Sequence, residues 1–150
     1  MNDVQRSVTI DAPRDRVWDV LSDLTAMRAY MPGLASVEHV GEAERGVGAA
    51  RHCVFADGVE LTERVTDWRE GTGYTLETTA FKGVPMASNE IRFVLSGDAR
   101  QTTVTQSMRY AMKGGILAPL LERMAKGRMV SALDGALGGL KEHVEARVEA

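Results

Sequence analysis

The sequence predicts an α+β protein in which a curved, seven-stranded antiparallel sheet wraps around one long C-terminal helix. Three observations predict this fold. Apolar and polar residues alternate in seven short stretches, and the links between the last six stretches have hairpin length. A single long apolar stripe with helical spacing closes the chain. Because a twisted sheet must bury one face, it curls around the long helix, and this arrangement leaves room for a cavity between them.

The N-terminal part predicts one strand followed by two short helices. The strand is indicated by apolar residues that alternate with polar ones, at Val4, Val8 and Ile10. Asp11 is placed to cap the first helix, and Pro13 suits its first turn. Thr25–Tyr30 predicts the second helix.

Six further strands are separated by turn residues. They are expected at Ser36–Val40, Ala49–Phe55, Val59–Trp68, Tyr74–Phe81, Ala87–Leu95 and Thr102–Met112. Asp57-Gly58, between the second and the third of these, is a strong hairpin signal. Links this short make consecutive strands antiparallel neighbours.

The C-terminal segment from Ile116 to Val148 predicts the long helix. Its apolar stripe consists of Val130, Leu133, Leu137, Leu140, Val144 and Val148. The apolar residues before Gly127 form a stripe that points in a different direction from the stripe after it. We therefore expect a kink at Gly127, or a short helix followed by the long one. The side of this helix opposite the apolar stripe carries small residues, including Gly135 and Gly139. They either let a second chain approach closely, as in a homodimer, or face solvent. We favour the solvent-facing interpretation.

Composition limits the class of protein. The 150 residues form one domain, 1–150, with material for a real core, and the net charge of −3 argues against a general nucleic-acid binder. No apolar run approaches the roughly 20 residues that span a bilayer, and the N-terminus has no signal peptide, so we expect no stable membrane insertion and a cytoplasmic location. Cys53 is alone and the three histidines match no metal spacing, so we expect no metal and no cofactor.

Several short motifs occur in a characteristic order. Ile10–Pro13 is followed by Val17-Trp18, Leu21–Asp23 and Gly46–Gly48, and the chain closes with Leu137–Val144. In these residues the chain resembles the START/Bet v 1-like (SRPBCC) superfamily and, within it, bacterial polyketide cyclase/dehydrase-like proteins. The resemblance implies a single domain with the helix-grip fold. The superfamily includes enzymes, lipid carriers and hormone receptors, so the resemblance leaves function open.

Strand parity assigns the residues that face the long helix. The predicted ligand-binding set is Leu61, Glu63, Tyr74, Leu76, Asn89, Phe93, Gln106, Met108 and Tyr110 on the sheet, with Leu133 and Leu137 on the helix. An apolar face with a few polar groups is typical of a small-molecule site. In Ala49–Phe55 parity is ambiguous, because either Arg51, Cys53 and Phe55 or His52 and Val54 point inward.

Glu63 is the sharpest candidate for chemistry. A carboxylate among apolar neighbours must pair with a partner, such as Arg51 or Gln106, or have its pKa raised until it is neutral. It is therefore either an acid, base or polar anchor for a ligand, or a structural residue paired with Arg51 or exposed at the rim. We favour the structural interpretation. His52 and Tyr110 are the other weak catalytic candidates.

Three functions fit these observations. The favoured one is a carrier or sensor that binds a small hydrophobic or aromatic ligand, lipid-like or polyketide-like, without changing it. The second is a polyketide aromatase/cyclase or dehydratase that uses acid–base groups in the same cavity, as the resemblance suggests. The third is a protein-interaction module whose cleft is filled by its own side chains.

Overall fold

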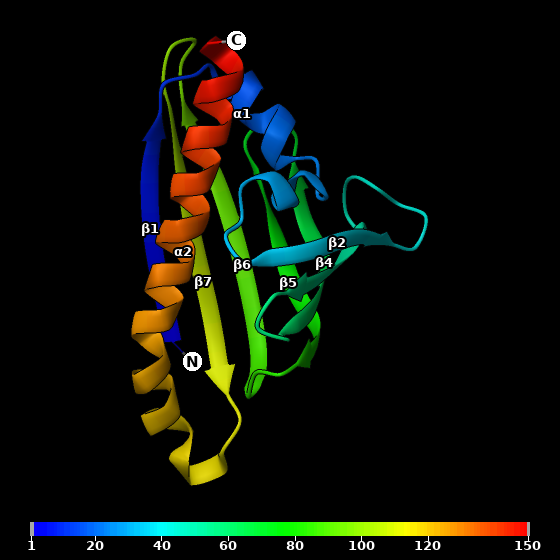
Figure 1. Cartoon of the computed structure of the whole chain (residues 1–150), viewed down its shortest axis with the longest axis vertical. Coiled ribbons are helices and arrows are strands. Elements are labelled where there is room, and N and C mark those ends of the chain that lie inside the picture. Colours follow the sequence, from blue (N-terminus) through cyan, green and yellow to red (C-terminus); the bar gives the residue numbers. More distant parts are fainter. Residues whose placement is uncertain (1, 150) are drawn as a thin grey trace.

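The computed structural model describes residues 2–149, and its elements follow the predicted order (Figure 1). In chain order they are β1 (Asn2–Ile10), α1 (Arg14–Leu21), the 3₁₀ helix η1 (Ala26–Ala29), β2 (Leu34–Val40), β3 (Ala50–Phe55), β4 (Glu60–Arg69), β5 (Gly73–Lys82), β6 (Met86–Gly97), β7 (Thr102–Met112), the 3₁₀ helix η2 (Gly115–Leu117) and α2 (Ala118–Glu149). The predicted α+β class and the helix-grip arrangement are confirmed.

The seven strands form one antiparallel sheet in the order β1-β7-β6-β5-β4-β3-β2. The pairing of β4 with β5 is interrupted by two unpaired residues, Thr66 in β4 and Thr79 in β5. Such bulges bend a strand and increase its twist. As a result β2 runs across the direction of β1 and β7, and the sheet curls around the space in front of it (Figure 1).

The helix α2 lies along the inner face of the sheet, where it packs against β1 and β7 (Figure 1). The middle of the predicted stripe is buried, at Leu133, Leu137, Leu140 and Val144. Of the two alternatives predicted at Gly127, a short helix followed by a separate long one is wrong, because α2 is one continuous helix from Ala118 to Glu149. An exposed glycine costs a helix only about 1 kcal/mol, which is too little to break one that is held by packing further along.

One α-helix follows β1, whereas two short helices were expected. The segment predicted as the second helix forms only the single 3₁₀ turn η1, which is typical of connectors this short. The capping role of Asp11 is also wrong: Pro13 occupies the N-cap of α1, and no side chain caps that helix. Asp11 instead accepts a hydrogen bond from Gln101 Nε2 at 3.0 Å.

At Gly139, α2 closely approaches the segment after η1. A Cβ atom at this position would lie 1.9 Å from the carbonyl oxygen of Tyr30, and one at Gly135 would lie 3.5 Å from Pro32 Cγ. The small residues on this side of α2 therefore admit the chain's own Tyr30–Pro32 segment. That segment forms part of the wall described below.

Gly139→Ala should lower the free energy of unfolding by roughly 1–3 kcal/mol, because the added methyl group forces Tyr30 away from α2. Urea denaturation measures the change. The neighbouring Gly138→Ala is the matched control, since its Cβ would meet nothing within 4 Å. It should gain up to about 1 kcal/mol from helix propensity. Equal effects of the two substitutions would contradict the close approach at Gly139.

Candidate functional site

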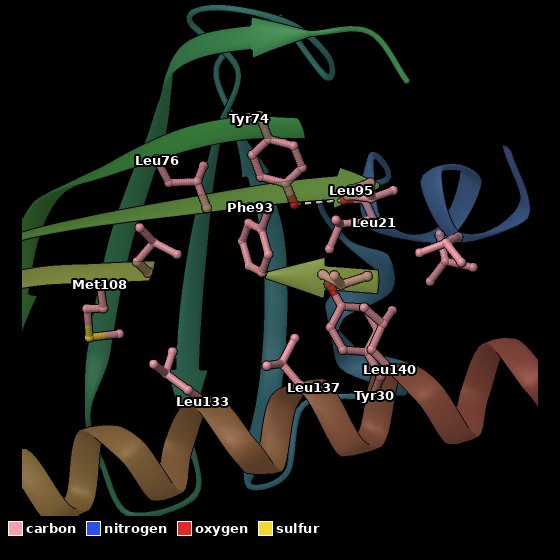
Figure 2. Packing of buried hydrophobic residues seen from close by; sticks show 14 of the residues in the cluster. Leu21, Tyr30, Tyr74, Leu76, Phe93, Leu95, Met108, Leu133, Leu137 and Leu140 are labelled. Carbon is pink, nitrogen blue, oxygen red and sulfur yellow. Dashed lines mark hydrogen bonds between the residues drawn. The ribbon is translucent and has the colours of Figure 1, made fainter. Parts of the chain in front are cut away.

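A cavity of about 270 Å³ lies between the inner face of the sheet and α2. Figure 2 shows Leu133 and Leu137 pointing from α2 toward the sheet, where Phe93 and Met108 lie opposite them. The wall is mainly apolar and is built by η1 and the next turn (Met27, Tyr30, Met31), the β3–β4 hairpin and β4 (Phe55, Asp57, Val59, Leu61, Glu63), β6 and the turn before it (Val84, Met86, Asn89, Ile91, Phe93), β7 (Gln106, Met108) and α2 (Arg128, Met129, Ala132, Leu133, Ala136, Leu137, Leu140).

Most residues of the predicted ligand-binding set lie on this wall. They are Leu61, Glu63, Asn89, Phe93, Gln106, Met108, Leu133 and Leu137. Tyr74, Leu76 and Tyr110 also point inward, but they are buried in the core away from the cavity surface. Alternation along a strand predicts the face on which a side chain lies, but not how deeply its neighbours cover it.

The two tyrosines that do not line the cavity have other partners. The Tyr74 ring stacks on Trp68 with centroids 5.3 Å apart and lies 5.2 Å from Phe93, and its hydroxyl donates to the Leu21 carbonyl at 2.8 Å (Figure 2). The Tyr110 hydroxyl donates to the Glu122 carbonyl at 3.2 Å. Because its hydroxyl is directed to the backbone of α2, Tyr110 is withdrawn as a catalytic candidate for the cavity.

His52 lies on the outer face of the sheet. Its Nδ1 is 2.9 Å from Thr62 Oγ1 and its Nε2 is 3.0 Å from Glu60 Oε1. The ambiguous parity of β3 is thus resolved, since Arg51 and Cys53 are buried on the inner side. His52 is therefore withdrawn as a catalytic candidate for the cavity.

Arg51 and Glu63 form a buried ion pair at one end of the cavity. The Arg51 side chain is 2% exposed and that of Glu63 is 3% exposed, and Arg51 Nε donates to Glu63 Oε1 at 2.9 Å. Arg51 Nη1 donates to the Leu24 carbonyl at 3.0 Å. Burial works to lower the pKa of Arg51, but the attraction of Glu63, supported by Tyr74, Tyr30 and Cys53, outweighs burial, and the pKa is raised. Glu63 is thus the counter-ion of a charged guanidinium, which is the structural role favoured for it.

The ion pair belongs to a row of buried polar side chains that crosses five strands. In register, Arg51 pairs with Glu63, Glu63 with Thr78, and Asn89 with Tyr110. Asn89 Nδ2 donates to Thr78 Oγ1 at 3.3 Å, which joins the two halves of the row. The row depends on the bulge at Thr79, because that extra residue places Thr78 rather than its neighbour opposite Glu63.

Two acceptors on the cavity wall have no hydrogen-bond partner among residues 2–149. Asn89 Oδ1 and Gln106 Oε1 are buried and make no hydrogen bond within the described residues. Both residues line the cavity, and they are 4% and 6% exposed. A buried acceptor without a partner costs about 1–3 kcal/mol, so a bound molecule that donates hydrogen bonds to these oxygens would recover that energy.

Three buried titratable side chains near the cavity, Tyr30, Cys53 and Tyr74, have pKa values that lie further from neutrality than usual. Burial raises the pKa of Tyr30, with the charge of Arg51 opposing it only in part. Burial raises the pKa of Tyr74 in the same way, and it raises the pKa of the Cys53 thiol to about 12. Acid–base catalysis at neutral pH works best with groups that titrate near 7. These shifts therefore favour binding over proton transfer.

Several of the wall residues that sequence reasoning missed lie in irregular segments. Met27, Tyr30 and Met31 belong to η1 and the turn after it, and Val84 lies in the β5–β6 turn. Such segments have no periodic pattern to indicate a buried face. The one available signal was Gly139, whose missing side chain marks a close approach, but its partner was not identifiable from the sequence.

Within residues 2–149 no group of three or more His, Cys, Asp or Glu side chains is arranged to hold a metal ion. The same residues contain no helix that combines the length and the apolar character required to cross a membrane.

The curled sheet, the long helix and the cavity between them define a START-like helix-grip protein. The chain belongs to the family described as polyketide cyclase / dehydrase and lipid transport, whose model matches residues 1–145. This membership confirms the resemblance drawn from the motifs. No curated protein sequence matches the chain.

Three solved structures illustrate the likeness. A Thermus thermophilus protein is 21% identical with a TM-score of 0.82, covering 97% of this chain and 99% of its own. The ZhuI aromatase/cyclase of a Streptomyces species is 17% identical with a TM-score of 0.80, covering 98% and 95%. A START superfamily protein of Mycobacterium smegmatis is 15% identical with a TM-score of 0.76, covering 96% and 97%. At these identities the likeness shows the fold alone.

Proposed function

We propose that the protein binds one small, mostly apolar molecule that carries hydrogen-bond donors, and acts as its carrier or sensor. The observation that carries this proposal is the pair of unpartnered oxygens, Asn89 Oδ1 and Gln106 Oε1, in an otherwise apolar wall. Family membership supports a hydrophobic ligand. A few placed polar groups in an apolar pocket orient such a ligand and select it.

The two oxygens favour a hydroxylated, polyketide-like ring compound over a simple acyl chain. A hydroxyl group donates to an amide oxygen, whereas an acyl chain would leave both acceptors buried and unsatisfied. A cavity of about 270 Å³ also suits a compact molecule. Methionines at 27, 31, 86, 108 and 129 provide an adaptable surface around it.

Gln106→Leu should weaken binding of 1-naphthol about tenfold and leave binding of naphthalene unchanged or tighter. The reason is that leucine keeps the apolar contact but removes the acceptor. Isothermal titration calorimetry with both probes measures the difference. Gln5→Leu, the same substitution at an exposed site, is the matched control and should change neither affinity. Equal losses for both probes, or no loss for either, would show that Gln106 does not accept a hydrogen bond from the ligand.

A second candidate function is that of a polyketide aromatase/cyclase or dehydratase. It is favoured by the position of Glu63 on the wall and by the structural likeness to an aromatase/cyclase. Glu63→Gln alone is a poor test, because it would leave Arg51 charged and buried without its counter-ion. The double variant Arg51→Met/Glu63→Met removes both charges together.

The double variant separates the two functions. A carrier should bind 1-naphthol within about tenfold of the wild-type affinity, because neither charge is required for the apolar contacts. An enzyme that depends on Glu63 should lose turnover of a poly-β-ketone by about a hundredfold or more. If the wild-type protein turned over the poly-β-ketone and the double variant did not, the enzymatic function would replace the carrier function.

A further inference from the structure

The junction between β7 and α2 exposes a group of large aliphatic side chains. Ile116 is 96% exposed, Met124 70%, Leu117 58% and Leu120 55%. Contiguous apolar side chains on a surface mark an interaction site more often than scattered ones do. We call this surface the α2 tip and define it by the aliphatic residues Ile116, Leu117, Leu120 and Met124 with the cations Lys113, Arg123, Lys126 and Arg128.

The α2 tip is positively charged, although the whole chain carries a net charge of −3. All four of its cations are exposed, and within residues 2–149 none of them forms an ion pair. The one carboxylate in the segment 113–128 is Glu122. Its Oε2 accepts a hydrogen bond from the Met112 backbone N–H at 3.0 Å, so it is directed toward the end of β7. The tip therefore combines aliphatic side chains with uncompensated positive charge.

The α2 tip is also connected to the cavity. Leu120, Met124 and Arg128 are spaced by four residues and lie along one side of α2. Arg128 and its neighbour Met129 line the cavity. Figure 1 shows that η2 and the start of α2 project beyond the ends of the strands, at one extremity of the molecule. The side of α2 that carries Leu120 and Met124 at the projecting end thus leads to Arg128 at the cavity.

We propose that the α2 tip docks the protein onto an anionic lipid membrane, with the aliphatic side chains in the headgroup region and the cations against lipid phosphates. A surface that combines exposed apolar side chains with cations binds anionic membranes through buried apolar area and electrostatic attraction together. Docking through the tip brings the cavity rim to the lipid surface, so an apolar ligand can pass between membrane and cavity. Ligand passage rests on the proposed function, whereas docking itself does not.

The charge and the shape of the α2 tip favour a membrane over a protein partner. If the same surface of a second copy paired with it, four exposed cations would face four others. A stable protein interface buries about 800 Å² on each partner, which a projecting end does not readily supply. A lipid surface accepts a projecting apolar end without any matching shape.

Co-sedimentation with vesicles tests the proposal without any cavity ligand. The full-length protein should bind phosphatidylcholine vesicles containing about 30% phosphatidylglycerol and release them at about 0.5 M salt, and it should bind pure phosphatidylcholine at least tenfold more weakly. Ile116→Glu and Lys126→Glu should each weaken binding about tenfold or more. The matched controls, at exposed positions far from the tip in the sequence, are Val47→Glu and Arg100→Glu, which should bind like wild type.

A fluorophore placed at the α2 tip reports insertion directly. Met124→Cys introduces an accessible thiol, while Cys53 is buried and its pKa is raised to about 12, so labelling is selective. An attached environment-sensitive dye should shift to the blue with anionic vesicles and not with neutral ones. Ligand affinity in vesicle-free solution should be unchanged by Ile116→Glu, which separates docking from the function of the cavity.

Three results would overturn the proposal. One is equal binding to anionic and neutral vesicles. Another is a wild-type protein that binds no vesicles and sediments as a dimer, while the Ile116→Glu variant sediments as a monomer. The tip would then join two copies of the chain. The third is an absence of binding to every vesicle by a monomeric protein, which would leave an acidic protein as the partner that fits the same cations.

Discussion

Arg51→Met is expected to lower the free energy of unfolding by about 3–5 kcal/mol. The substitution leaves the carboxylate of Glu63 buried without its counter-ion, in a position where its side chain is only 3% exposed. It also removes the donor to the Leu24 carbonyl, which connects β3 to the segment before η1. Urea denaturation followed by tryptophan fluorescence measures the loss, since Trp18 and Trp68 report on the core.

Two further variants show whether the loss arises from the buried charge. Arg51→Met/Glu63→Met should regain most of the lost stability, because replacing a buried ion pair by apolar side chains of similar volume is often neutral. Arg6→Met breaks the ion pair with Asp134, whose side chains are 49% and 47% exposed, and should cost less than about 1 kcal/mol. A double variant as unstable as Arg51→Met would show that the arginine contributes through packing rather than through charge.

Leu137→Asp is expected to destabilise the protein by at least about 4 kcal/mol and to leave little folded material. Leu137 is 2% exposed and lies on the stripe that holds α2 against the sheet. The substitution removes a large apolar contact and places a carboxylate in an apolar wall. Because domains of this size have a total stability of only about 5–15 kcal/mol, the change consumes a large part of it.

Thermal unfolding followed by circular dichroism measures this effect. Leu120→Asp is the matched control, since the same substitution on the same helix falls where the side chain is 55% exposed, and it should change stability by less than about 0.5 kcal/mol. If Leu137→Asp melted like Leu120→Asp, then α2 would not pack on the sheet through this stripe.

The sequence by itself determined the seven strands and the long helix, and the buried faces of most of them. Leu133 and Leu137 lie on one side of a helix because of their spacing, and Phe93 and Met108 lie on the inner face because strands alternate. Both inferences depend on local periodicity, which is a property of neighbouring residues. Glu63 was recognisable for the same reason, as a carboxylate at an inner position of its strand.

Only the tertiary structure decided how those faces become a site. The Arg51–Glu63 pair requires the register between β3 and β4, and the row that continues it to Asn89 requires the bulge at Thr79. The depth of Tyr74 depends on contacts with aromatic rings and a carbonyl on other elements. Met31 reaches the wall because Gly139, far away in the chain, lets its segment approach α2. These contacts join residues that are distant in the chain. A local sequence pattern does not predict them, because the free energy that selects them arises only when the elements pack together.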